Sequence, residues 1–579
     1  MSVFDKEDRK FFKRIIILVV LLVISLSYLV YDRSISYSRY ERVEFQSTGA
    51  TLFANLYYPS KSLAFQDQRP LVIYCHGIGS QRDFDLRIPV ELTKRGFYVA
   101  ALDYQGHGES GGNIVNIDPV TKIPALAQDC SRLLDKLETL PFYSDVNTSQ
   151  IGLIGHSLGG FVSLMNQALD PRFNVTVAWA PLVKYDPDII KIFPHEFDDY
   201  MPARLLNSTN TKNLLIIMHV EDEVLSYKDQ ALVAQNLTGC ELINITRPLI
   251  GGGHQLFANE VIIESIKWFE IHFFYSETKN GPINITFLVN YVIIFITLIL
   301  LVLIVLLLTS YTSKFFPYKP VREDLQRQKP KEQKLLMKIK VRVNKVRKIL
   351  QIILYTTLFL LNWQIFERAL GLGGIFFASL NITAIYFIGK FILYYRKLKK
   401  QEIKFNLKQV ILLIKSQFQA KYLFYAILCN AYFIGIYLIF SFFYPFAFMW
   451  PSNFLNTGLA AVVVFPVYFS LELLFRKVIY PLLNFIKNER KKSLVIILIA
   501  TFIQLNLMAL TWSWAFFPSV IFMYLILLYA IVQNTLIYEK TQRFSTVILS
   551  SFDIIQLFFA AVISNAIGIG SALHLFVSF

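Results

Sequence analysis

Cysteine is scarce in this chain of 579 residues, which has four cysteines and eight histidines. Cys75, Cys130, Cys240 and Cys429 lack the close paired spacing of metal-binding cysteines. We therefore expect no metal site and no cofactor. Cys75 ends an apolar run typical of a buried strand and Cys429 lies in a long apolar segment, so both are interpreted as small core residues. A pairing of Cys130 with Cys240 stays open.

Acidic residues are also few, since 41 of them stand against 57 basic residues and leave a formal net charge of +16. The basic residues lie between apolar segments and not along one amphipathic face, so we expect no nucleic-acid partner. In such positions lysine and arginine report the orientation of membrane segments. With 54% hydrophobic residues, the chain is too apolar for an ordinary soluble protein and too long for one domain.

The N-terminal segment predicts a membrane anchor. A charged head at residues 1–14 precedes an apolar run at 15–31, which is about the minimum length for crossing a bilayer. Lys10, Lys13 and Arg14 stand directly before the run and favour a cytoplasmic N-terminus. The run is long for a signal peptide and no A-x-A-like site follows it, so we expect an uncleaved signal anchor and not a cleaved signal peptide.

Residues 38–276 have the composition of a water-soluble domain, which the anchor places outside the cytoplasm. Apolar runs typical of strands alternate with helical stretches, which predicts a mostly parallel sheet with helices on both faces. In that architecture ligands bind beyond the carboxyl ends of the strands. The predicted strands are 52–58, 71–75, 98–102, 151–154, 175–179 and 214–219, with another near 241–246.

Asparagine sequons support an outer location for this domain. They occur at Asn147, Asn174, Asn207, Asn236, Asn244 and Asn284. The clustering exceeds what average composition supplies by chance, so we expect a glycoprotein if the organism glycosylates.

The rest of the chain predicts an all-α polytopic transmembrane domain. A span at 285–311 leads to a basic cytoplasmic loop at 312–348, and 349–579 carries about seven further helices. We expect an integral protein of the plasma membrane. The later spans are predicted at 349–366, 372–394, 421–447, 456–482, 493–512, 516–537 and 546–576.

The predicted span at 456–482 carries a pair of opposite charges. Glu472 and Arg476 stand four residues apart on one predicted helical face, so each can neutralise the other. We interpret them as a packed pair, with an interfacial position for Arg476 or an intramembrane active site as alternatives.

The stretch 151–160 carries the strongest chemical signal. It is an apolar run that ends in Gly155-His156-Ser157-Leu158-Gly159, followed by a proline-free helical stretch. A serine flanked by glycines two residues away on either side fits a sharp strand-to-helix turn that exposes its hydroxyl. We interpret Ser157 as a nucleophile.

A serine hydroxyl needs a histidine to take its proton and a carboxylate to orient that histidine. On this fold the order is serine, acid, histidine. His254, in a glycine-flanked loop, is the candidate base. The acid should follow the strand 214–219, where we favour Asp222; Glu223 stays open because the spacing from His219 is one residue short of the common form.

Acyl transfer also needs N–H donors for the developing oxyanion. One is expected from Leu158, directly after the nucleophile at a helix N-terminus. The other is expected from Ile78, since His76-Gly77-Ile78 follows an apolar strand; an ordinary turn is the alternative.

Four motifs together resemble the α/β-hydrolase superfamily, and within it the serine aminopeptidase (S33) and monoacylglycerol-lipase-like branch. They are residues 71–79, 101–110, 155–159 and 252–254. The stretch from Asp103 resembles the branch's D-x-x-G-H-G-x-S loop, which has a structural role in the family. The resemblance implies the α/β hydrolase fold and a serine nucleophile, and it does not extend to the membrane half.

The combined motifs predict a membrane-anchored serine hydrolase that cleaves an ester, thioester or amide on the outer face of the membrane. Residues 181–210, which interrupt the strand and helix alternation, are expected to form a lid. The expected partners are membrane lipids and a small-molecule, lipid or peptide substrate. A transport or lipid-handling protein with a silent hydrolase-like domain is the alternative, and a third reading has the membrane half present a lipid to the hydrolase.

Overall fold

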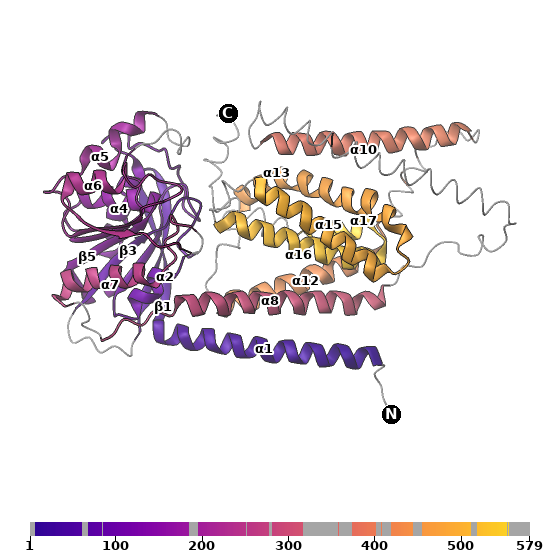
Figure 1. The fold of residues 1–579 in the computed structure, drawn as a ribbon, viewed down its shortest axis with the longest axis horizontal. Coiled ribbons are helices and arrows are strands. Elements are labelled where there is room, and N and C mark those ends of the chain that lie inside the picture. Colours follow the sequence, from indigo (N-terminus) through magenta and orange to yellow (C-terminus); the bar gives the residue numbers. More distant parts are fainter. Residues whose placement is uncertain are drawn as a thin grey trace.

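The computed structural model describes most of the chain in two regions, a sheet domain and a set of long helices (Figure 1). The described residues are 6–60, 68–83, 85–184, 195–249, 252–276, 281–316, 373–400, 418–443, 454–510 and 518–552, with single residues 357, 407, 411 and 554.

The sheet domain holds one eight-stranded sheet in the order β1-β2-β4-β3-β5-β6-β7-β8. The strands from β4 to β8 in this order are all parallel, whereas β2 is antiparallel to both β1 and β4. The bounds are β1 Tyr37–Ser47, β2 Ala50–Pro59, β3 Arg69–Cys75, β4 Tyr98–Asp103, β5 Val146–His156, β6 Val175–Trp179, β7 Leu214–His219 and β8 Glu241–Ile245. The mostly parallel sheet confirms the predicted fold class.

Helices cover both faces of this sheet, as Figure 1 shows. α2 (Arg87–Thr93) and α7 (Asn259–Phe274) contact each other on one face, and α3 (Asp129–Leu137) and α4 (Leu158–Leu169) do so on the other. Short helices α5 (Pro202–Leu205) and α6 (Ala231–Thr238) continue the second layer. Strands covered on both faces must be apolar throughout, which is why the central strands are continuous hydrophobic runs.

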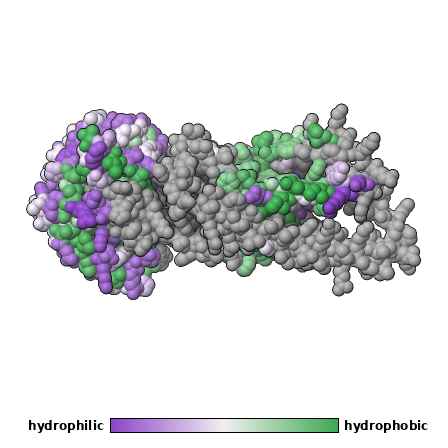
Figure 2. Space-filling model, turned by 90° about the horizontal axis from the view of Figure 1, so that it is seen from above, coloured by the Kyte–Doolittle hydropathy of each residue, from purple (hydrophilic) through white to green (hydrophobic). Residues whose placement is uncertain are grey.

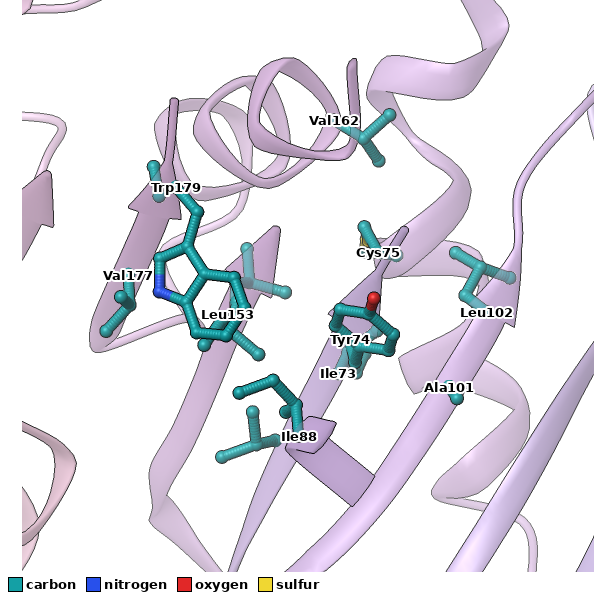
Figure 3. Packing of buried hydrophobic residues seen from close by; sticks show 14 of the residues in the cluster. Ile73, Tyr74, Cys75, Ile88, Ala101, Leu102, Leu153, Val162, Val177 and Trp179 are labelled. Carbon is teal, nitrogen blue, oxygen red and sulfur yellow. The ribbon is translucent and has the colours of Figure 1, made fainter. Parts of the chain in front are cut away.

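The core lies between the central strands and these helices. Figure 3 shows Ile73, Leu153 and Val177 on neighbouring strands, with Val162 of α4 above them and Trp179 and Ile88 nearby. Trp179 is fully buried, and its indole N–H donates to Ser265 Oγ of α7 at 2.9 Å. The bond satisfies the one polar group of the ring inside the core.

The structure decides whether Cys130 pairs with Cys240, which the sequence left open. All four thiols are free in the described part of the chain. The thiol of Cys130 lies 3.4 Å from that of Cys75, sulfur to sulfur, and so does not pair with Cys240. Cys75 and Cys429 are buried, as expected for small core residues.

Among the described residues, three helices are long and apolar enough to cross a membrane: Glu7–Ser36, Phe287–Phe315 and Phe377–Arg396. They agree with the predicted spans at 15–31, 285–311 and 372–394. The first and third lie within α1 (Lys6–Ser36) and α10 (Gly373–Lys400), and the second consists of α8 (Phe287–Thr312) and the 3-10 turn Ser313–Phe315 that follows it. In Figure 2 the described surface of this region is largely hydrophobic, and that of the sheet domain is mixed.

Other predicted spans coincide with helices, and as spans they stay predictions. The helices are α12 (Ala420–Phe443), α13 (Phe454–Leu473), α15 (Glu489–Leu510) and α16 (Pro518–Thr541), with the short α17 (Phe544–Ser550) after them. Apart from single residues, the predicted span 349–366 lies outside the described residues, as do most of 546–576 and of the basic loop 312–348.

The charged pair of the helical region is buried and fully hydrogen-bonded. Arg476 Nε donates to Glu472 Oε2 at 2.9 Å, and its Nη1 donates to Thr535 Oγ1 at 2.8 Å. Asn534 donates to the other Glu472 oxygen at 3.0 Å. These contacts neutralise the two charges away from water, and they connect α13 and the π-helical segment after it, Leu474–Ile479, to α16.

Candidate active site

The candidate nucleophile sits where β5 turns into α4. Ser157 has φ 56° and ψ −116°, a conformation unusual for a residue with a side chain. A Cβ on Gly155 would collide with the Gly159 carbonyl, and one on Gly159 with the carbonyls of Cys75 and His76. Glycine is therefore required on both sides of the turn, and the crowding fixes the position of the serine.

Three side chains from separate loops form one hydrogen-bonded chain. His254 Nε2 lies 3.0 Å from Ser157 Oγ, and His254 Nδ1 lies 2.8 Å from Asp222 Oδ2. In the neutral ring, Nδ1–H donates to the carboxylate and Nε2 accepts from the serine hydroxyl. Ser157 and His254 are buried, at 7% and 3% exposure, so little water competes for these bonds.

Asp222 is held on the histidine ring by its own loop. Its Oδ1 accepts the backbone N–H groups of Val224 and Leu225, both at 2.8 Å. Burial raises the pKa of Asp222, but the His254 ring and these N–H groups outweigh it and lower the pKa below its usual value. The carboxylate is therefore ionised at neutral pH and able to stabilise a positive imidazolium.

Glu223, left open above as the acid, contacts the backbone of the histidine loop and not the ring. Its Oε2 accepts the N–H of Gly253 at 2.8 Å and that of His254 at 3.2 Å. From the other side, the His156 ring nitrogen Nε2 lies 2.8 Å from the His254 carbonyl oxygen. Burial and the nearby His254 lower the pKa of His156 to about 3, so this ring is neutral and donates an N–H.

Neither of these backbone contacts was predicted from the sequence. His156 lies inside the nucleophile motif and Glu223 next to the acid, so adjacency was the only signal. Together they hold the backbone of His254 from its N–H and its C=O sides.

The two expected oxyanion donors lie just beyond the ends of two neighbouring strands. β3 and β5 pair with Cys75 opposite Gly155, so the stretches 76–78 and 156–158 leave the sheet from adjacent strand ends. The N–H of Leu158 belongs to the first turn of α4, where backbone donors have no intrahelical acceptor. Gly77 is required in this approach, because a Cβ there would lie 2.9 Å from His156 Nδ1.

Residues 66–246 match the family model described as "Serine aminopeptidase, S33". The sheet domain is an α/β-hydrolase domain. The match confirms the resemblance seen in the motifs.

Individual proteins similar to this chain share 25% identity or less with it. The platelet-activating factor acetylhydrolase of Cavia porcellus is 25% identical over 172 residues, which cover 22% of this chain and only 39% of that relative. An S-formylglutathione hydrolase from Agrobacterium tumefaciens has 16% identity and a TM-score of 0.33, over 40% of this chain and 94% of that one. Acetyl xylan esterase 1 from a Thermoanaerobacterium species has 19% identity and a TM-score of 0.32, over 43% and 93%.

The Asp103 loop is held to neighbouring loops of the hydrolase domain by hydrogen bonds and an ion pair. Asp103 is buried, and its carboxylate accepts the backbone N–H of Arg82 at 2.6 Å and that of Glu109 at 3.1 Å. The Arg82 guanidinium also binds Asp103 and reaches Glu109 Oε2 at 2.7 Å. His76 Nε2 lies 3.5 Å from Asp103 Oδ1. Asp103 and His76 thus connect the loops without contacting Ser157, in keeping with the structural role expected of this motif.

Asp103 gives the hydrolase domain a predicted acid sensitivity. Burial raises its pKa, but Arg82 and His76 outweigh this and lower it from 3.8 to about 2. Because its pKa is lower in the folded protein, Asp103 stabilises the fold at pH values above its pKa in the unfolded chain. This contribution, about 2 kcal/mol, is lost as the pH falls from about 4 to about 2.

In urea unfolding of the detergent-solubilised chain, the free energy of unfolding of Asp103→Asn should therefore fall furthest below that of wild type near pH 6. The gap should narrow by about 2 kcal/mol towards pH 2. Glu264→Gln, which changes a half-buried carboxylate on α7, is the control. A gap that is equal at both pH values would contradict the assignment.

Among the described residues, no three His, Cys, Asp or Glu side chains gather where they could hold a metal ion. The predicted lid, 181–210, is described only in part, because residues 185–194 lie outside the described residues. The start of this segment is held by Gln230, whose Oε1 accepts the backbone N–H groups of Val183 and Lys184 at 2.6 and 2.8 Å.

Proposed function

We propose that this protein is a membrane-anchored serine hydrolase that cleaves an ester, thioester or amide through an acyl-enzyme. The observation that carries the proposal is the bonded chain from Ser157 through His254 to Asp222, built on the strained turn at Ser157. The serine, base and acid lie within hydrogen-bond distance in the order that such catalysis needs.

In the proposed reaction Ser157 Oγ attacks the carbonyl carbon while His254 Nε2 takes the hydroxyl proton. The N–H groups of Leu158 and Ile78 donate to the resulting oxyanion. Collapse of the intermediate breaks the bond to the leaving group, which receives the proton from His254, and the acyl group stays on Ser157. Water then repeats the sequence, losing a proton to His254, and releases the acid. Asp222 orients the ring and stabilises its charged form.

The same proposal places the protein in the plasma membrane, with its hydrolase domain outside the cytoplasm. The basic residues before the anchor support it. The six sequon asparagines named above are also all at least partly exposed. Among the three bond types, the name of the Cavia porcellus relative, an acetylhydrolase, favours an ester.

A fluorophosphonate probe tests the activity directly, because it modifies only a serine that is activated for attack. We expect the detergent-purified full chain to be labelled, with the adduct on the peptide that contains Ser157. Heat-unfolded protein should take no label. Absence of labelling in folded protein would contradict the proposal and favour a transport or lipid-handling protein with a silent domain.

A further inference from the structure

The first turn of α8 is fastened to helix α2 of the hydrolase domain. Glu91 of α2 is buried, and its Oε1 accepts the N–H groups of Thr286 and Phe287, both at 3.0 Å. A carboxylate at this position satisfies free backbone donors and the positive end of the helix. Lys94, which directly follows α2, also binds Thr286 and lies 3.4 Å from Glu91.

Helix α1 joins the same contact through Asp32, which is buried. Asp32 accepts from Thr286 Oγ1 at 3.1 Å and from Asn290 Nδ2 at 2.6 Å, and it lies 3.5 Å from Lys94 Nζ. We call these residues, Asp32, Glu91, Lys94, Thr286 and Asn290, the membrane joint. Its bonds fix the hydrolase domain relative to both apolar helices.

The membrane joint fixes which end of the strands faces the bilayer. α2 starts beside the active site, since Arg87 Nη1 donates to the carbonyl of Leu256, two residues after His254. Helix α2 ends near the opposite end of the strands, where β4 begins at Tyr98. Residues 286 and 287 of α8 therefore lie beside the far half of α2.

Further along, α8 reaches the active-site end of α2. The ring centre of Phe257 lies 6.5 Å from that of Phe287 and 6.0 Å from that of Tyr291, and Arg87 lies 4.2 Å over Phe257. The residues of α8 after Tyr291 extend about 30 Å beyond this point. Figure 1 shows α8 and α1 leaving the domain side by side in this direction.

The lipid-facing surface of these helices starts at the level of the active site. On α8, Leu288, Val289 and Val292 are 43%, 50% and 58% exposed, and on α1 Val30 is 42% exposed. Apolar side chains exposed on a membrane helix mark the part that lies in hydrocarbon. On α8 these residues alternate with Phe287 and Tyr291, whose rings lie near that of Phe257. Phe257 is three residues from His254 in the chain.

We propose that the active-site end of the strands faces the bilayer and that the substrate is a long-chain ester of a membrane lipid, taken directly from the adjoining leaflet. This inference rests on the proposed hydrolase activity. A lipid ester keeps its acyl chains in the hydrocarbon while its carbonyl lies at the membrane surface, which is the level at which the joint holds Ser157. A water-soluble ester gains nothing from this placement.

The test uses the full chain in vesicles of dialkyl ether lipids, which contain no ester bond. A fluorescent diacylglycerol and a fluorescent diacyl phosphatidylcholine are the lipid probes, and 4-methylumbelliferyl acetate is the soluble probe. We expect a lipid probe to be cleaved when it shares the vesicles with the protein, and at least tenfold more slowly when it is supplied in separate vesicles.

The outcomes separate the two proposals. Acetate cleavage with neither lipid probe cleaved, or equal rates from shared and separate vesicles, overturns the bilayer route and leaves the hydrolase standing. Loss of both acetate cleavage and fluorophosphonate labelling overturns the hydrolase itself.

Loosening the membrane joint should affect only the lipid reaction. Glu91→Ala removes the cap on α8, and we expect the ratio of lipid to acetate cleavage to fall at least fivefold while labelling of Ser157 persists. Glu264→Ala, which breaks a half-buried ion pair on α7, is the matched control. Where Glu91→Ala protein is not labelled, Asp32→Asn replaces it. An unchanged ratio in a labelled variant overturns the role of the joint.

Discussion

Ser157→Ala is expected to lower kcat for 4-methylumbelliferyl acetate about 10⁶-fold, the largest effect of any single change in this chain. The methyl group cannot attack the carbonyl carbon, so no acyl-enzyme forms. His254→Ala should cost about as much, because the hydroxyl of Ser157 then has no base within reach.

The double variant distinguishes a working unit from two independent contributions. Since each single change already stops the same step, Ser157→Ala with His254→Ala should be no slower than either alone. Ser144→Ala, an exposed serine of the same domain, is the control and should keep wild-type kcat. Turnover by Ser157→Ala within tenfold of wild type would show that another group performs the reaction.

The fold of the hydrolase domain could be predicted because its central strands are buried on both faces. Such strands are continuous apolar runs, and β3, β4, β5, β6 and β7 are visible in the sequence for that reason. β1 is different: five consecutive residues of this edge strand are exposed, and it carries no comparable pattern. β1 was therefore not among the predicted strands.

The nucleophile turn could be predicted for a related reason. Its geometry excludes every side chain at Gly155 and Gly159, so the constraint is written into residue type. The membrane joint has no such signature. It combines Asp32, Glu91 and Asn290, which are ordinary polar residues far apart in the chain, and their proximity follows only from the way α1, α2 and α8 pack.

The acid loop shows the same limit at closer range. Glu221, Asp222 and Glu223 are consecutive carboxylates after one strand, and residue type cannot say which of them reaches the histidine. The path of the loop decides: Asp222 meets the ring, Glu223 meets the backbone of Gly253 and His254, and Glu221 is exposed. This division of roles leads to the second large predicted effect.

Asp222→Asn is expected to lower kcat about 10⁴-fold, whereas Glu223→Gln should lower it only about tenfold. An amide at position 222 can donate to His254 Nδ1, which favours the tautomer with the proton on Nε2, and that tautomer cannot accept from Ser157. It also removes the negative charge that stabilises the imidazolium. A glutamine at position 223 keeps an oxygen that accepts from Gly253 and His254, so the ring stays near its position.

Steady-state hydrolysis of the acetate ester by the three variants Glu221→Gln, Asp222→Asn and Glu223→Gln measures the difference. Glu221→Gln changes the same charge on the same loop without contacting the histidine loop, and it should match wild type. Glu223→Ala provides a graded check, because losing both backbone contacts lets His254 shift and should cost about 10²-fold, mainly in kcat. If Glu223→Gln were as slow as Asp222→Asn, the assignment of Asp222 as the orienting acid would be wrong, and Glu223 would take its place.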